Sequence, residues 1–96
     1  MSTSHLSTKA LHAGYEPLAH QGAQAVPIYQ TSSYVFENAD DAAERFNLSR
    51  AGYIYTRLNN PTNDTLEQRL AAVEGGVGAV VTSSGAAAIT TTFLTL

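Results

Sequence analysis

Residues 52–62 constrain the fold of this chain more than any other segment, because they end in a strong helix start. Asn60 can cap a helix, and the fixed φ of Pro61 suits the first helical position. Apolar residues then recur at i, i+4 and i+7 along one helix face: Leu66, Leu70 and Val73. Gly75 and Gly76 follow where a left-handed residue is wanted. The pattern predicts a long helix that begins at Pro61 and ends before Gly75.

Tyr55 and Arg57 lie two residues apart just before this helix start. In an extended segment, side chains two apart project on the same side. The guanidinium fork matches phosphate or carboxylate oxygens, and the phenol adds one more donor. We therefore expect an anion site here. The alternative, for so common a triplet, is that Tyr55 packs on a core and Arg57 lies in solvent.

A second candidate anion site lies between a predicted buried strand at residues 79–82 and a predicted helix at residues 86–96. The first N–H groups of a helix have no internal partner and lie at the positive end of its dipole. Gly85 allows close approach to the backbone, and Ser84 adds a hydroxyl. The alternative is an ordinary strand-to-helix turn capped by serine. The P-loop pattern and its lysine are absent.

The rest of the chain carries weaker signals. Residues 1–13 predict a short helix, and residues 38–47 predict another, with acids Asp40 and Asp41 in its first turn. Residues 14–36 show little periodicity, so we expect an extended arm that wraps around something such as a partner subunit. Within it, residues 27–36 are β-prone.

Composition narrows the class of protein. The 96 residues suffice for one small domain with a modest core, and 14% charged with 44% hydrophobic residues resembles interior α/β sequence. A net charge of −3 argues against a general nucleic-acid or anionic-membrane surface. The chain has no cysteine, no secretory leader pattern and no long apolar stretch, which indicates a cytoplasmic protein. Its last residues break off inside an apolar helix stripe, so we expect an amino-terminal piece of a larger protein.

Few other residues suggest chemistry. The histidines show no metal-ligand spacing with one another, and we expect no metal site: His5, His12 and His20. Glu67 and Glu74, seven apart on the long helix, are expected to be solvated. No Ser–His–Asp arrangement is apparent, and the single lysine is Lys9.

Four segments, in this order, resemble the pyridoxal-phosphate-dependent enzymes of cysteine and methionine metabolism. They are residues 25–36, 53–64, 66–76 and 83–85. The resemblance covers almost the whole chain after about residue 8. Residues 11–15 and 54–57 favour the O-acetylhomoserine sulfhydrylase (aminocarboxypropyltransferase) branch over the cystathionine lyases and synthases.

The resemblance implies an α/β protein with the type I fold of PLP-dependent transferases, built on a mostly parallel sheet. Residues 1–50 would form the amino-terminal arm and a short helix, and residues 51–96 the start of the large cofactor-binding domain. The complete protein would replace the acetyl group of O-acetylhomoserine with sulfide or a thiol, giving homocysteine or methionine. The alternatives are methionine γ-lyase, cystathionine γ-synthase or lyase, a non-catalytic phosphate-binding module, and an inactive truncated fragment.

The resemblance also implies site residues for pyridoxal 5′-phosphate. Tyr55 and Arg57 would reach across a subunit interface and hold the cofactor phosphate of the neighbour. Ser84 and the backbone amides of Gly85 and Ala86 would hold the phosphate in the chain's own subunit. The protein would then be a homo-oligomer, a dimer of dimers, acting on a small amino acid. Tyr55 would also be catalytic, helping to deprotonate the incoming amino acid.

Two differences from the family pattern bear on activity. Ala86 stands where the family often has Gln or Met, which removes a side-chain contact but leaves the backbone N–H. Family enzymes hold the cofactor as a Schiff base on a lysine far along the chain, whereas Lys9 lies outside every matching motif. The 96-residue chain alone is therefore expected to be inactive.

Overall fold

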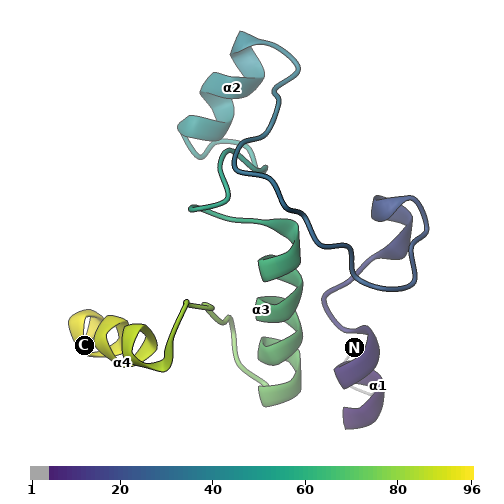
Figure 1. Cartoon of the computed structure of the whole chain (residues 1–96), viewed down its shortest axis with the longest axis vertical. Helices are drawn as coiled ribbons and strands as arrows, with labels where there is room; N and C mark the ends of the chain where they lie inside the picture. Colours follow the sequence, from purple (N-terminus) through teal and green to yellow (C-terminus); the bar gives the residue numbers. More distant parts are fainter. Residues whose placement is uncertain (1–4) are drawn as a thin grey trace. The chain divides into compact units, whose positions relative to one another are not determined.

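The structure is a computed structural model that describes residues 5–96. Its elements are α1 (Leu6–His12), the 3₁₀ helix η1 (Pro17–His20), α2 (Ala39–Phe46), α3 (Pro61–Glu74) and α4 (Gly85–Thr95), drawn in Figure 1. The described residues form two compact units, one of the residues up to Tyr15 with Thr65–Leu96, and the other of Glu16–Asp64. The two-part division at residue 50 stays a prediction.

The helix predictions are confirmed, and their caps explain why. Asn60 Oδ1 accepts a 2.9 Å hydrogen bond from the Thr62 N–H at the start of α3, and Gly75 ends that helix with φ at +71°. The Asn38 side chain caps α2 in the same way. α1 lies within residues 1–13 as predicted, although residues 1–4 of that prediction lie outside the described residues.

The predicted strand at residues 79–82 is wrong for the described chain. In residues 5–96 the only β pairing is an isolated antiparallel bridge between Ser33 and Tyr55. A strand needs a partner, and the Val81 N–H instead donates to Glu67 Oε2 at 2.9 Å. Glu67 is therefore not simply solvated, as its place on a predicted helix had suggested. The parallel sheet is the part of the predicted fold class that these residues do not form.

The modest apolar core expected from composition is also absent among the residues that the structure describes. Apart from Pro61, none of their apolar side chains is buried, whereas three polar ones are: Asp41, Asn60 and Thr65. The apolar face of α4 is open, with Ile89 60%, Phe93 74% and Leu96 95% exposed. Polar contacts rather than apolar burial therefore hold each unit together.

The β-prone segment that follows η1 does not project freely. Thr62 Oγ1 accepts from the Tyr29 N–H at 2.9 Å and donates to the Pro27 carbonyl at 2.8 Å. Asn60 Nδ2 donates to the Tyr29 carbonyl at 2.9 Å. Further along, the Thr56 N–H donates to the carbonyl of Ser32 at 2.8 Å. The residues that start α3 thus bind the arm of their own chain. Contact between this arm and a partner subunit stays a prediction.

A buried ion pair joins α2 to the residues on either side of it. Asp41 is 2% exposed, and its carboxylate accepts hydrogen bonds from the Glu37 N–H at 3.1 Å and from Arg45 Nε at 3.1 Å. Arg50 Nη1 lies 3.0 Å from the same carboxylate. The pKa of Asp41 is lowered, first by the Glu37 N–H and then by the two arginines, against the opposing effect of burial. Asp41 therefore stays ionised.

In the other unit, α1 ends against α3 at a glycine. Arg69 Nε donates to the Ala13 carbonyl at 2.8 Å. Gly14 follows with φ at +79°, and a Cβ there would lie 2.8 Å from Gln68 Cβ and 3.0 Å from the Thr65 carbonyl oxygen. Only glycine fits this contact without a shift of backbone.

No helix within residues 5–96 has the length and apolar character needed to cross a membrane.

We expect Gly14→Ala to destabilise the protein more than Gly22→Ala, measured as the free energy of unfolding in urea. The two φ angles are nearly equal, at +79° for Gly14 and +78° for Gly22, so both variants carry the left-handed backbone strain of about 1–2 kcal/mol. Gly22 has nothing within 4 Å of the added Cβ, whereas Gly14 meets α3. Equal losses for the two variants would contradict the contact between Gly14 and α3.

We expect Asp41→Asn to lower the stability of the protein at neutral pH, and this difference from wild type to vanish in acid. Because the folded pKa of Asp41 lies below the unfolded value of about 3.9, the carboxylate stabilises the fold above that value. The contribution is lost as the pH falls through the folded pKa, so urea unfolding at about pH 7 and about pH 2 measures it. Asp40→Asn, in the same helical turn but exposed, is the control and should change little at either pH. A difference that persists in acid would contradict the ionised Asp41.

Candidate functional site

Tyr55 and Arg57 come together, although the chain does not run extended between them. The Tyr55 carbonyl accepts hydrogen bonds from the N–H groups of Leu58 at 2.9 Å and Asn59 at 3.2 Å, so the chain turns at Tyr55. Arg57 Cζ lies 4.9 Å from the centroid of the Tyr55 ring, a cation–π contact. The expectation that the two side chains share one side is confirmed. The extended geometry predicted for them is wrong, because the turn that leads into α3 begins at Tyr55, two residues before Arg57.

The donors of this pair are open to a guest. Within residues 5–96, Arg57 forms no ion pair or hydrogen bond, and its side chain is exposed. Tyr55 is 36% exposed. Both line an open cleft of about 420 Å³ whose remaining walls are mostly apolar or aromatic: Ser33, Tyr34, Phe36, Phe46, Ile54 and Leu58. Such a cleft suits an anionic group carried on an apolar or aromatic body.

Tyr53 fixes the segment just before this pair. Its hydroxyl donates to Asp64 Oδ2 at 2.7 Å, and its ring centroid lies 5.4 Å from that of Tyr34. Burial first, and the Asp64 carboxylate second, raise the pKa of the Tyr53 phenol well above its usual value. Tyr53 therefore stays protonated and acts as a fixed hydrogen-bond donor to the first turn of α3.

The second predicted site lies at the start of α4, in the other unit. The Ser84 side chain caps this helix, because its Oγ accepts from the Ala87 N–H at 3.1 Å. In the described part of the chain, no acceptor pairs with the N–H groups of Gly85 and Ala86. A Cβ at Gly85 would meet nothing within 4 Å. The placement of Ser84, Gly85 and Ala86 at a helix start is confirmed. The binding of a phosphate by these residues stays a prediction.

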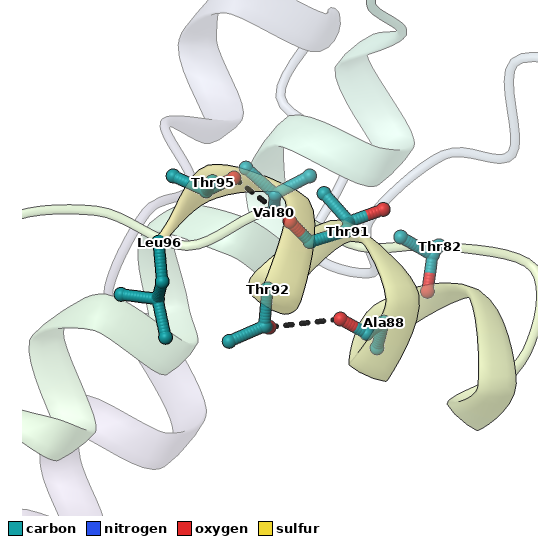
Figure 2. A pocket seen from close by; sticks show the side chains of 7 residues that line it. All are labelled: Val80, Thr82, Ala88, Thr91, Thr92, Thr95 and Leu96. Carbon is teal, nitrogen blue, oxygen red and sulfur yellow. Dashed lines mark hydrogen bonds between the residues drawn. The ribbon is translucent and has the colours of Figure 1, made fainter.

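A groove beside α4 offers no such ligands. Figure 2 shows its lining residues: Val80, Thr82, Ala88, Thr91, Thr92, Thr95 and Leu96. Two threonine hydroxyls are used inside the helix, since Thr92 Oγ1 donates to the Ala88 carbonyl and Thr95 Oγ1 to the Thr91 carbonyl, each at 2.8 Å. The groove therefore presents methyl groups rather than charge. The first turn of α4 is therefore the candidate anion site in this unit.

Sequence reasoning missed the residues that hold the Tyr55 segment in place. Asn60 was interpreted only as a helix cap, but it and Thr62 also bind the arm. Asp41 was interpreted only as a first-turn acid. The i, i+4 spacing of Asp41 and Arg45 could have indicated their ion pair. The burial of Asp41 could not have been foreseen, because it depends on residues on both sides of α2.

Among residues 5–96, no three histidine, aspartate or glutamate side chains gather into a group that could bind a metal ion.

Comparison with known proteins places these observations in one family. The family model described as Cys/Met metabolism PLP-dependent enzyme matches residues 7–96. The chain is 57% identical over 81 residues to the O-acetyl-L-homoserine sulfhydrylase of Leptospira meyeri, covering 84% of this chain and 18% of that protein. It is 50% identical over 91 residues to the L-methionine gamma-lyase of Fusobacterium nucleatum subsp. polymorphum, covering 95% of this chain and 23% of that protein.

A solved structure agrees with these relatives. The crystal structure of a Campylobacter jejuni protein assigned as an O-acetylhomoserine (thiol)-lyase matches with a TM-score of 0.74 and 53% identity, over 79% of this chain and 19% of that chain. That crystal structure holds N′-pyridoxyl-lysine-5′-monophosphate at its position 205. The chain spans about a fifth of the length of the relatives that it matches. Because the family model covers the chain from residue 7 to its last residue, this chain belongs to the PLP-dependent enzymes of Cys/Met metabolism.

Proposed function

We propose that this chain is the amino-terminal part of a PLP-dependent O-acetylhomoserine sulfhydrylase. The complete enzyme would replace the acetyl group of O-acetylhomoserine with sulfide or a thiol, giving homocysteine or methionine. The observation that carries the proposal is the Arg57 guanidinium, which has no acidic partner within residues 5–96 and lies over the Tyr55 ring at the edge of an apolar cleft. The 57% identity to a sulfhydrylase supports this branch, and the 50% identity to a methionine γ-lyase makes that reaction the second candidate.

Tyr55 and Arg57 fit the cofactor phosphate in charge and in donors. A phosphate dianion takes charge-assisted hydrogen bonds, and a guanidinium with no acidic partner among residues 5–96 supplies them. The adjacent cleft is lined by Tyr34, Phe36 and Phe46, so an aromatic ring attached to the phosphate would meet apolar surface. We therefore assign the cofactor phosphate to this pair.

Ser84, Gly85 and Ala86 fit a second phosphate. The backbone N–H groups of Gly85 and Ala86, which have no acceptor among residues 5–96, lie at the positive end of α4 and can serve as ligands for an anion, and the open space around Gly85 lets it approach. Ala86 would contribute its backbone N–H only. We propose that the two sets serve two active sites: Ser84, Gly85 and Ala86 in the chain's own subunit, and Tyr55 with Arg57 in its neighbour. The enzyme would then be a homo-oligomer, a dimer of dimers.

When bound, pyridoxal phosphate withdraws electrons from the α-carbon of an amino acid, and so supplies the carbanion stabilisation that replacement at the γ-carbon needs. Within that chemistry, Tyr55 would be the catalytic residue: as the phenolate, its oxygen would accept a proton from the ammonium group of the substrate. Lys9, the single lysine of the chain, lies in α1 and outside the four motif segments that carry the resemblance, so we propose that the 96-residue chain alone is inactive. A cytoplasmic location belongs to this proposal as well.

We expect the complete enzyme to form homocysteine and acetate from O-acetylhomoserine and sulfide. The assay measures both products, and methionine is offered as the substrate in a parallel reaction. Release of methanethiol from methionine, with no homocysteine from O-acetylhomoserine, would assign the γ-lyase reaction instead. The isolated 96-residue chain with added pyridoxal phosphate is the control, and we expect neither product from it.

We expect Arg57→Ala to weaken cofactor retention by the complete enzyme by about 1.5–3 kcal/mol, the range of a charged hydrogen bond. Arg57→Lys keeps the charge but loses the bidentate fork, so its loss should be smaller. Titration of the apoenzyme with pyridoxal phosphate, followed by cofactor absorbance, gives the affinity of each variant. Unchanged affinity in Arg57→Ala would remove Arg57 from the phosphate site.

A further inference from the structure

Arg45 lies where α2 meets the segment that carries Tyr55 and Arg57. Its Nη1 donates to the Tyr53 carbonyl at 3.0 Å, two residues before Tyr55. Its Cζ lies 5.4 Å from the centroid of the Phe36 ring, and Phe36 lines the same cleft as Arg57. Arg45 thus touches both the backbone that leads to the pair and one wall of its cleft.

The position of Arg45 is closely determined. Its side chain is 19% exposed, and its Nε donates to the carboxylate of Asp41, which is itself 2% exposed. Asp41 also accepts from the Glu37 N–H, so it is held from outside the helix. On the opposite side, Gly52 leaves room for Arg45, because a Cβ on Gly52 would lie 2.8 Å from Arg45 Nε. Asp41 and the Tyr53 carbonyl therefore hold the guanidinium between them.

Tyr53 is consequently fixed at two points. Arg45 holds its carbonyl, and Asp64 accepts its hydroxyl at 2.7 Å. The next peptide is held as well, since the Ile54 carbonyl accepts the Tyr34 N–H at 3.2 Å. Tyr55 and Arg57 are themselves exposed, so their direction depends on this anchored backbone rather than on packing.

We propose that Arg45, held by the buried Asp41, is a positioning residue that sets the direction of the Tyr55–Arg57 pair toward the phosphate. The inference rests on the proposed function, because it assigns the pair to the cofactor phosphate. Arg45 does not touch the phosphate, and it acts through the Tyr53 carbonyl. The alternative is that Arg45 only stabilises α2, in which case its loss would change the stability of the enzyme and not the contribution of Arg57.

The test is a double-mutant cycle on the complete enzyme, with pyridoxal phosphate affinity of the apoenzyme as the readout. We expect Arg45→Met to weaken that affinity by roughly tenfold in the wild-type background, the lower end for a charged hydrogen bond. In the Arg57→Ala background we expect Arg45→Met to add less than about twofold, because a residue that acts through Arg57 has nothing left to position. A full tenfold loss in both backgrounds, or no loss in either, would overturn the inference.

Three further variants separate positioning from folding. Arg50→Met removes the other cation beside Asp41 without touching Tyr53, so it is the matched control, and we expect its cofactor affinity to stay within about twofold. Gly52→Ala pushes Arg45 aside and keeps its charge, so it should weaken affinity in the same direction as Arg45→Met. Arg45→Lys has one compact cation in place of a fork, and its affinity should lie between wild type and Arg45→Met.

Loss of Arg45 leaves Asp41 paired with Arg50, so the buried carboxylate keeps a partner in Arg45→Met. Should that variant fail to fold, Arg45→Lys and Gly52→Ala decide by the same criterion in both backgrounds. An equal loss of affinity in Arg50→Met and Arg45→Met would overturn the inference. If Arg57→Ala alone leaves cofactor affinity unchanged, the proposed function of the pair fails and the inference falls with it. If Arg57→Ala weakens affinity and the Arg45 variants do not, only the positioning role fails.

Discussion

The side chain of Asn60 is the contact on which the Glu16–Asp64 unit most depends. It is 3% exposed, and both ends of its amide are used. Oδ1 accepts from the Thr62 N–H and so starts α3, while Nδ2 donates to the Tyr29 carbonyl and to Thr56 Oγ1. A buried amide that is fully hydrogen-bonded determines the orientation of every group it touches. Through this one residue, the helix start, the arm and the turn after Tyr55 are held in a single arrangement.

Polar organisation of this kind replaces an apolar core in the described residues. Burial of apolar surface is the main stabilising contribution in most domains, yet Leu66, Leu70, Ile89 and Phe93 are all 43% or more exposed here. The Asp41 ion pair and the hydrogen bonds of Asn60 and Thr62 to residues 27–29 hold the Glu16–Asp64 unit instead. In the other unit, the side chains of Arg69 and Glu67 hydrogen-bond the backbone of Ala13 and Val81. Exposed apolar faces of this extent are typical of contact surfaces.

The candidate site follows from the same polar contacts. Tyr53, Asp64 and Arg45 fix the backbone of this segment, so the donors of Tyr55 and Arg57 remain available to a ligand. At α4, the Ser84 cap satisfies the Ala87 N–H, and the N–H groups of Gly85 and Ala86 have no acceptor in the described part of the chain. In both places one set of residues fixes the local structure, and a neighbouring set is left free for a ligand. A site that binds an anion needs both kinds of residue: those that fix the backbone and those whose donors face the ligand.

The sequence by itself determined what depends on neighbouring residues. Helix starts at Asn38, Asn60 and Ser84 and the stop at Gly75 were predictable, because a cap and a glycine act within one turn. Only the tertiary structure decided what depends on distant residues. The predicted strand at residues 79–82 has no partner among the described residues, and the hydrogen bond from the Thr62 hydroxyl to the Pro27 carbonyl joins positions 35 apart. The meeting of Tyr55 with Arg57 was predicted, but by an extended geometry that the turn replaced. Strand pairing, burial of charge and the direction of an exposed side chain are all set by residues far apart in the chain, and local pattern does not contain them.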